Sequence, residues 1–155
     1  MSLTLAADVV IEVLRGREPH FRVRMDEARA ADIGLHVSSV VLHELALGAL
    51  KSDRPTFHLE RLDAFVSEVE VDAWSGEDAM AAARVQFDLG QHGQALGTLD
   101  MMIAGQAVNR GRTVVTNNLR EFIRLPHLDV LDWSDPAGPL DRSQAWLQLM
   151  RKPAK

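Results

Sequence analysis

The chain has 155 residues, of which 46% are hydrophobic and 25% are charged, and its formal net charge is -5. This composition suits a single globular domain, and the acidic total argues against general electrostatic attraction to nucleic acid. The sequence has no cysteine, no apolar run long enough to span a membrane and no secretory leader, so disulfides and thiolate metal sites are excluded and a cytoplasmic location is expected.

The first third of the chain alternates between strand-like and helix-like patterns. An apolar run at residues 3–7 predicts a strand that leads into a helix at 9–14, which a glycine ends. A helix is predicted at 19–31, where a proline is suited to the first turn. A short strand at 34–39 ends in serines that can cap the next helix, at 40–50.

The middle of the chain continues the alternation. Apolar residues at helical spacing predict a helix at 55–69, and a short strand is expected at 69–74. A serine followed three residues later by an aspartate predicts the start of a helix at 75–89. A glycine-bearing loop at 90–97 then leads into a helix at 98–108.

The last elements complete an α/β pattern. A compact strand is predicted at 112–116, a loop with a helical turn at 117–125, and a last strand at 127–133. Strands alternating with helices predict one α/β domain at residues 1–133, with a mostly parallel central sheet of four or five strands flanked by helices. Residues 134–155 are expected to be an extension with one short helix, around 143–150.

Four polar positions stand near the carboxyl ends of the predicted strands, where parallel α/β sheets usually bind ligands. They are Asp8, Glu44, Asp100 and Asn118. Each has an ordinary structural explanation: an aspartate at a helix start is a common cap, a helix glutamate usually faces solvent, and asparagine often makes a turn. Taken singly, none of these residues predicts catalysis.

Four ordered motifs change that interpretation. ADVVIEVLRG near the start is followed by SSVVLHELALGAL, GTLDMMIAGQAVNRG and TVVTNNLREFIRLPHLDVLDW. In this order and spacing they resemble the PIN-domain family and, within it, the VapC toxins of type II toxin–antitoxin systems. The resemblance spans Leu5 to Trp133. It implies a small parallel sheet flanked by helices, with acidic residues from distant segments converging on one site.

The resemblance also implies an endoribonuclease that cleaves RNA phosphodiester bonds with Mg²⁺ or Mn²⁺. Magnesium prefers oxygen ligands, and carboxylates can hold it against a phosphate. Matched position by position, Glu44 is the second family acid and Asp100 is the third. Asn118 occupies the place of a fourth Asp or Asn, with Thr116 as its usual companion. Glu121 lies just beyond as a supporting acid.

The first family acid falls on Ala6, and Asp8 falls on the neighbouring Asn or Ser place. Since residues two apart in a strand project to the same side, Asp8 is expected to substitute in part for the missing ligand, as a catalytic and metal-binding residue. The activity of this chain is expected to be impaired. The survival of every other marker favours an introduced Asp→Ala replacement over a naturally degenerate site.

Partners follow from the same resemblance. A VapB-type antitoxin is expected to inhibit the toxin in a groove formed by apolar faces of the helices at 9–14 and 40–50. The alternative for these faces is ordinary core packing, and part of each face must be core. A homodimer is expected, operator DNA only through the antitoxin, and no membrane. Arg15 and Arg120 are candidate RNA-binding residues, with a solvated surface as the alternative. Two other functions stay open: a PIN-fold binding module that cannot cut, and an unrelated α/β ligand-binding domain.

Overall fold

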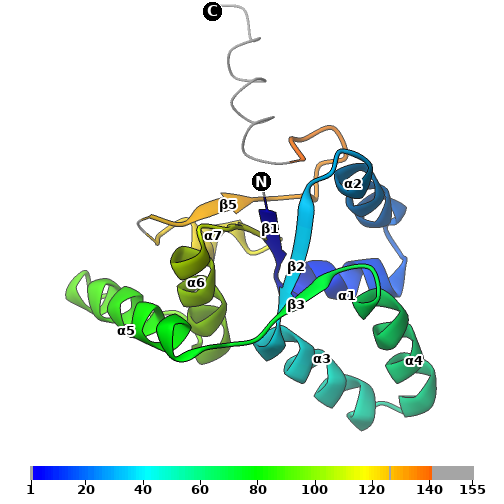
Figure 1. The fold of residues 1–155 in the computed structure, drawn as a ribbon, viewed down its shortest axis with the longest axis horizontal. Helices are drawn as coiled ribbons and strands as arrows, with labels where there is room; N and C mark the ends of the chain where they lie inside the picture. Colours follow the sequence, from blue (N-terminus) through cyan, green and yellow to red (C-terminus); the bar gives the residue numbers. More distant parts are fainter. Residues whose placement is uncertain (1, 126, 141–155) are drawn as a thin grey trace, which may run out of the picture.

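The computed structural model describes residues 2–125 and 127–140, which form a five-stranded sheet flanked by helices on both faces (Figure 1). The strands are β1 (Ser2–Leu5), β2 (Gly34–Ser38), β3 (Glu70–Asp72), β4 (Thr113–Val115) and β5 (Asp129–Leu131). The helices are α1 (Ala7–Arg15), α2 (Pro19–Ala30), α3 (Ser39–Lys51), α4 (Pro55–Val66), α5 (Gly76–Gln91), α6 (Thr98–Arg110) and α7 (Leu119–Phe122).

The sheet is parallel throughout, with the strand order β3-β2-β1-β4-β5. The central strand β1 pairs on one side with β2, where Thr4 lies opposite His36, and on the other with β4, where Leu5 lies opposite Val115. Because all strands run in the same direction, their carboxyl ends meet at one edge of the sheet, which is where such folds bind ligands. The predicted fold class is confirmed.

Two hydrophobic clusters cover the two faces of the sheet. On one face, Leu3 and Leu5 of β1 pack with residues of α1 and α2. On the other face, Val114 of β4 packs with apolar residues of α5 and α6. Neighbouring strand residues point to opposite faces, so Val115 belongs to the first cluster. The sheet is therefore packed on both faces, and its carboxyl edge lies between the two layers of helices.

Helices α5 and α6 pack side by side on one face of the sheet (Figure 1). Their backbones approach so closely that a Cβ built on Gly105 of α6 would lie 2.4 Å from both the Cα and the Cβ of Ala82 in α5. The start of α5 is closed by a capping box, in which Ser75 and Asp78 exchange side chain to backbone hydrogen bonds. The candidate site residue Asp100, in the first turn of α6, therefore belongs to a closely packed pair of helices.

Several element boundaries differ from the predicted ones. Strand β1 runs from Ser2 to Leu5 and α1 begins at Ala7, so the predicted strand 3–7 starts one residue and ends two residues too late. Helix α5 continues to Gln91 and so includes Gly90, which was predicted to lie in the loop. The left-handed backbone conformation that is typical of a helix end occurs here only at Gly93, after the helix. The helix predicted around 143–150 lies outside the described residues. In the part of the chain that the structure describes, no helix has the length and apolar character needed to cross a membrane.

Candidate active site

The first site position lies in the turn between β1 and α1. Ala6 is 3% exposed, its N–H donates to the carbonyl oxygen of Val115 at 2.9 Å, and it occupies the N-cap of α1 without a side-chain cap. The expectation that Ala6 and Asp8 share one face of a strand is wrong, because β1 ends at Leu5 and Asp8 lies in the first turn of a helix. A methyl group thus stands where the resemblance predicts the first acid.

Asp8 is held by four hydrogen bonds from the protein itself. Its Oδ1 accepts one from the N–H of Val9 at 2.8 Å. Its Oδ2 accepts one from Thr116 Oγ1 at 2.9 Å, and two from the N–H groups of Asn117 at 2.9 Å and Asn118 at 3.2 Å. Asp8 therefore fastens the segment after β4 to the start of α1. Since a carboxylate oxygen accepts about two hydrogen bonds, only Oδ1 retains capacity for a further ligand.

Glu44 and Asp100 reach the same edge from different layers. Glu44 lies in the second turn of α3, which follows β2, and Asp100 lies in the first turn of α6. Partial burial of its carboxyl group raises the pKa of Glu44, and the negative charges of Asp100 and Asp8 raise it further, against a smaller opposite effect of His43. Burial likewise raises the pKa of Asp100, with added repulsion from Asp8 and Glu121. The charges of Asp8 and Asp100 thus act on Glu44, and those of Asp8 and Glu121 act on Asp100.

The segment after β4 carries the remaining predicted residues. The N–H of Asn118 also donates to Thr116 Oγ1 at 2.9 Å, so the backbone of this segment is fixed, while the side chain of Asn118 is exposed. Glu121 lies in α7 and pairs with Arg124, one turn further on. Arg120, the candidate RNA-binding residue, is exposed in the same helix.

The donors at this edge suit a hard divalent cation in kind, because Mg²⁺ and Mn²⁺ prefer carboxylate and amide oxygens. The number of these donors is too small, however. Across residues 2–125 and 127–140, no three Asp, Glu or His side chains gather closely enough to hold a metal ion. Glu44 and Asp100 offer carboxylates, Asp8 offers one oxygen, and Ala6 offers none. The site thus fits a metal in chemistry and lacks a ligand at position 6.

Glu44 also lines a groove of about 640 Å³ between α1, α3 and α4. Its lining combines apolar side chains with three arginines; the residues are Ile11, Leu14, Arg15, Arg17, Glu44, Leu45, Gly48, Ala49, Ser52, Phe57, His58, Arg61 and Leu62. Arg61 donates to the carbonyl oxygen of Leu14 across the groove. The guanidinium of Arg54 lies 4.0 Å from the centre of the Phe57 ring. The predicted groove on α1 and α3 exists, and α4 supplies a wall that the sequence did not predict.

One buried acid plays a larger part than the sequence suggested. Asp78, predicted only as a helix-start residue, is fully buried and also accepts hydrogen bonds from Gln106, Asn109 and Arg110 of α6. These donors hold its pKa well below the usual range in spite of its burial. The only signal in the sequence was its spacing from Ser75, because its α6 partners become neighbours through the fold.

Comparison with known proteins agrees with this geometry. Residues 5–128 match the model of the PIN domain family. The tRNA(fMet)-specific endonuclease VapC of Salmonella typhimurium is 34% identical over 133 residues, which cover 86% of this chain and 98% of that protein.

Solved structures give the same family. A chain of the VapBC2 crystal structure from Rickettsia felis, bound to a DNA fragment from the promoter, matches with a TM-score of 0.82 at 28% identity, covering 86% of this chain and all of that one. A chain of DNA-bound VapBC from Salmonella typhimurium matches with a TM-score of 0.80 at 34% identity, covering 86% and 98%. The chain therefore belongs to the PIN-domain family, among the VapC proteins.

Proposed function

We propose that this chain is a VapC-type toxin whose site is built for metal-dependent cleavage of RNA phosphodiester bonds. The observation that carries the proposal is that Asp8, Glu44 and Asp100 lie in the first two turns of α1, α3 and α6 of a PIN fold, where the charge of Asp8 acts on both Glu44 and Asp100 and the charge of Asp100 acts on Glu44. Relatives covering most of the chain are named endonucleases and ribonucleases. Acids crowded in this way repel an RNA backbone unless a cation lies between them, so a metal belongs to the proposal.

Each residue has a proposed task. Glu44 and Asp100 would hold Mg²⁺ or Mn²⁺, with Oδ1 of Asp8 as the remaining acceptor beside them. When bound, the ion would neutralise the phosphate and lower the pKa of an attacking water. Thr116 and Asp8 fix the backbone of Asn118, so that its exposed amide can orient the substrate. Glu121 supports the negative field at the edge, and Arg120 is placed to contact a phosphate.

The missing acid favours a second function for the chain as it stands. With a buried methyl group at Ala6, the site lacks a carboxylate that the family pattern contains. Such a chain keeps the fold, the groove and the other acids, and it would act as a binding module that forms antitoxin complexes without cutting. Impaired activity is therefore proposed for this chain, and full activity for its Ala6→Asp form.

The groove is the proposed place of a VapB-type antitoxin. Several structural neighbours are VapBC complexes, some of them bound to DNA. An extended or helical segment that buries apolar side chains against Leu14 and Leu45 would also meet Glu44 in the lining of the groove, where a basic residue would pair with the acid. Operator DNA would be reached only through the antitoxin. The RNA and the antitoxin belong to the cytoplasm, which is the proposed location.

A homodimer stays a prediction from the family. Two large apolar side chains on α5, Met80 and Phe87, are 62% and 65% exposed. They are seven residues apart and therefore lie on one side of the helix. This side of α5 is away from the groove, and it is the proposed contact with a second copy.

Cleavage assays on this chain and its Ala6→Asp form, each free of antitoxin, test the function. With Mg²⁺ or Mn²⁺, the Ala6→Asp form should cleave RNA at least about 100-fold faster, because removing one electrostatic contact from a transition state commonly costs that much. Ala6→Asn is the matched control, since it adds a side chain of the same size without the charge. Inactivity of a correctly folded Ala6→Asp form would overturn the catalytic proposal and leave the binding module.

A further inference from the structure

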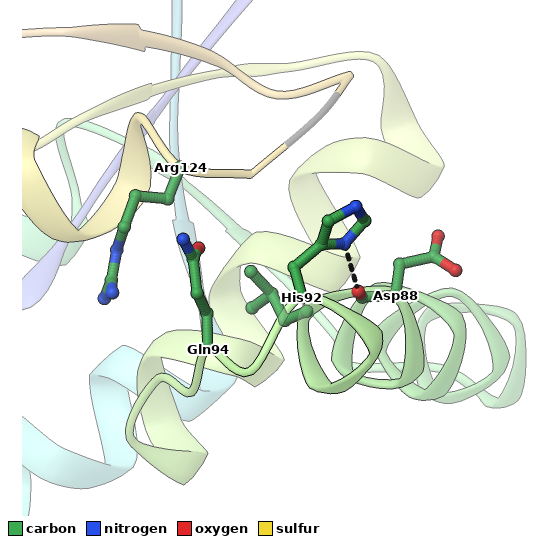
Figure 2. Close-up of a pocket in the computed structure, with 5 residues that line it drawn as sticks. Asp88, His92, Gln94 and Arg124 are labelled. Atoms are coloured by element: carbon green, nitrogen blue, oxygen red, sulfur yellow. Dashed lines mark hydrogen bonds between the residues drawn. The ribbon is translucent and has the colours of Figure 1, made fainter.

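A second concavity lies beside the loop that joins α5 to α6. It has a volume of about 250 Å³, and it is lined by Asp88, Leu89, His92, Gln94 and Arg124 (Figure 2). The residues come from the end of α5, the loop after it and the segment after α7. This pocket shares no residue with the groove between α1, α3 and α4.

The pocket offers hydrogen-bonding groups over an apolar floor. Leu89 is 3% exposed and forms the floor. The Nδ1 of His92 lies 2.9 Å from the backbone carbonyl oxygen of Asp88, so Nδ1 donates there and the neutral ring keeps Nε2 as an acceptor. The amide of Gln94 offers both donors and an acceptor. In Figure 2 the carboxylate of Asp88 extends away from Gln94 and Arg124. The guanidinium of Arg124 is the cation on that side, and it is paired with Glu121.

Two connections join the pocket to the acid edge. Arg124 donates to the carbonyl oxygen of Ala95 at 3.4 Å and pairs with Glu121, the supporting acid of α7. The charge of Glu121 in turn acts on Asp100. The loop that carries Gln94 also runs directly into α6, whose first turn holds Asp100. The pocket is therefore linked to Glu121 by an ion pair and to Asp100 by the chain itself.

We propose that this pocket binds one nucleotide of single-stranded RNA next to the scissile phosphate, with Gln94 and His92 reading the base edge and Arg124 facing a phosphate. The inference rests on the proposed function and adds a subsite to it. Unpaired RNA bases are recognised by hydrogen bonds to their edges and by apolar contact, and arginine suits phosphate geometry. The pocket is smaller than a typical drug-sized site, which matches a single flat base.

Binding to the chain as it stands tests the subsite without cleavage. The probe is a fluorescein-labelled single-stranded RNA of mixed sequence and about twelve nucleotides, within the length that such grooves cover. Gln94→Glu keeps the size of the side chain and puts a negative charge in the pocket, so its affinity should fall about tenfold. Gln91→Glu is the matched control: it makes the same charge change three residues away, on an exposed residue that does not line the pocket. Its affinity should change less than twofold.

A second measurement separates a subsite from a general charge effect. In the Ala6→Asp background, sequencing of the cleaved ends should show that Gln94→Ala changes the nucleotide preference at one position beside the cut and leaves the other positions unaltered. Equal affinity losses for Gln94→Glu and Gln91→Glu, or no RNA binding by the parent chain, would overturn the subsite. If Ala6→Asp still cleaves RNA in that case, the proposed function stands without it.

Discussion

The carboxylates of Glu44 and Asp100 oppose the stability of the protein in the absence of a cation. Burial and mutual repulsion raise the pKa of both groups in the folded chain above the ordinary values of 4.5 and 3.8. The folded state therefore holds these protons more tightly than the unfolded state. The contribution of these two groups to the free energy of unfolding is most favourable below their ordinary pKa values, and it falls as the pH rises through the raised ones.

Neutral replacements should remove this penalty. In buffer with EDTA at pH 7, Glu44→Gln and Asp100→Asn should each raise the melting temperature by a few degrees at most, since both carboxyl groups remain partly solvated. At about pH 3, where the unfolded carboxyls are also protonated, the gain should disappear. Thermal unfolding followed by circular dichroism over this pH range measures it. Glu60→Gln, on an exposed residue of α4, is the control. A gain that persists at low pH would contradict the electrostatic explanation.

At the residue scale, the sequence predicted the members of the site better than their contacts. Glu44 and Asp100 were recognisable from their motifs, and the structure brings them into electrostatic range. The four hydrogen bonds to Asp8 were not predictable, because three of them come from a segment more than 100 residues away. No sequence motif marked Gln94 as a pocket residue, because the pocket forms only when the fold brings Gln94 and Arg124 together.

At the scale of elements, the crossing of α5 and α6 fixes where Asp100 stands. Gly105→Ala would place a methyl group 2.4 Å from Ala82, so the helices must move apart. We expect the free energy of unfolding to fall by about 1–3 kcal/mol, the usual effect of overpacking. Gly48→Ala is the matched control, because a Cβ there meets nothing within 4 Å and Gly48 lies within α3. That change should stabilise the chain by up to about 1 kcal/mol. Urea denaturation measures both, and a Gly105→Ala form as stable as the parent would refute the tight crossing.

The order and type of the elements followed from hydrophobic periodicity and caps, which are local properties of the chain. The parallel arrangement followed from the alternation of strands and helices. Boundaries such as the end of β1 at Leu5 were less predictable, because β4 decides how far the sheet can pair. The need for glycine at 105 is likewise set by Ala82 in another helix.

At the scale of the whole molecule, the proposed binding of RNA requires an acidic protein to gather positive charge in one place. The net charge is -5, yet the groove that Glu44 lines also carries Arg15, Arg17 and Arg61. Attraction at long range should therefore be weak, and we expect affinity to depend on phosphates that enter the groove and replace counterions. The same groove is the proposed antitoxin site, so RNA and antitoxin should exclude each other.

Charge reversal at Arg15 tests this distribution of charge. Arg15→Glu should weaken the binding of single-stranded RNA several-fold at low salt, and it should reduce the salt slope by about one phosphate contact. Arg29→Glu makes the same charge change on an exposed residue of α2 that lines neither the groove nor the pocket. Because both variants reach the same net charge, a general effect would weaken them equally. Fluorescence anisotropy over a salt series distinguishes the two cases. A larger loss for Arg15→Glu places RNA in the groove, and equal losses would mean that only the total charge of the molecule matters.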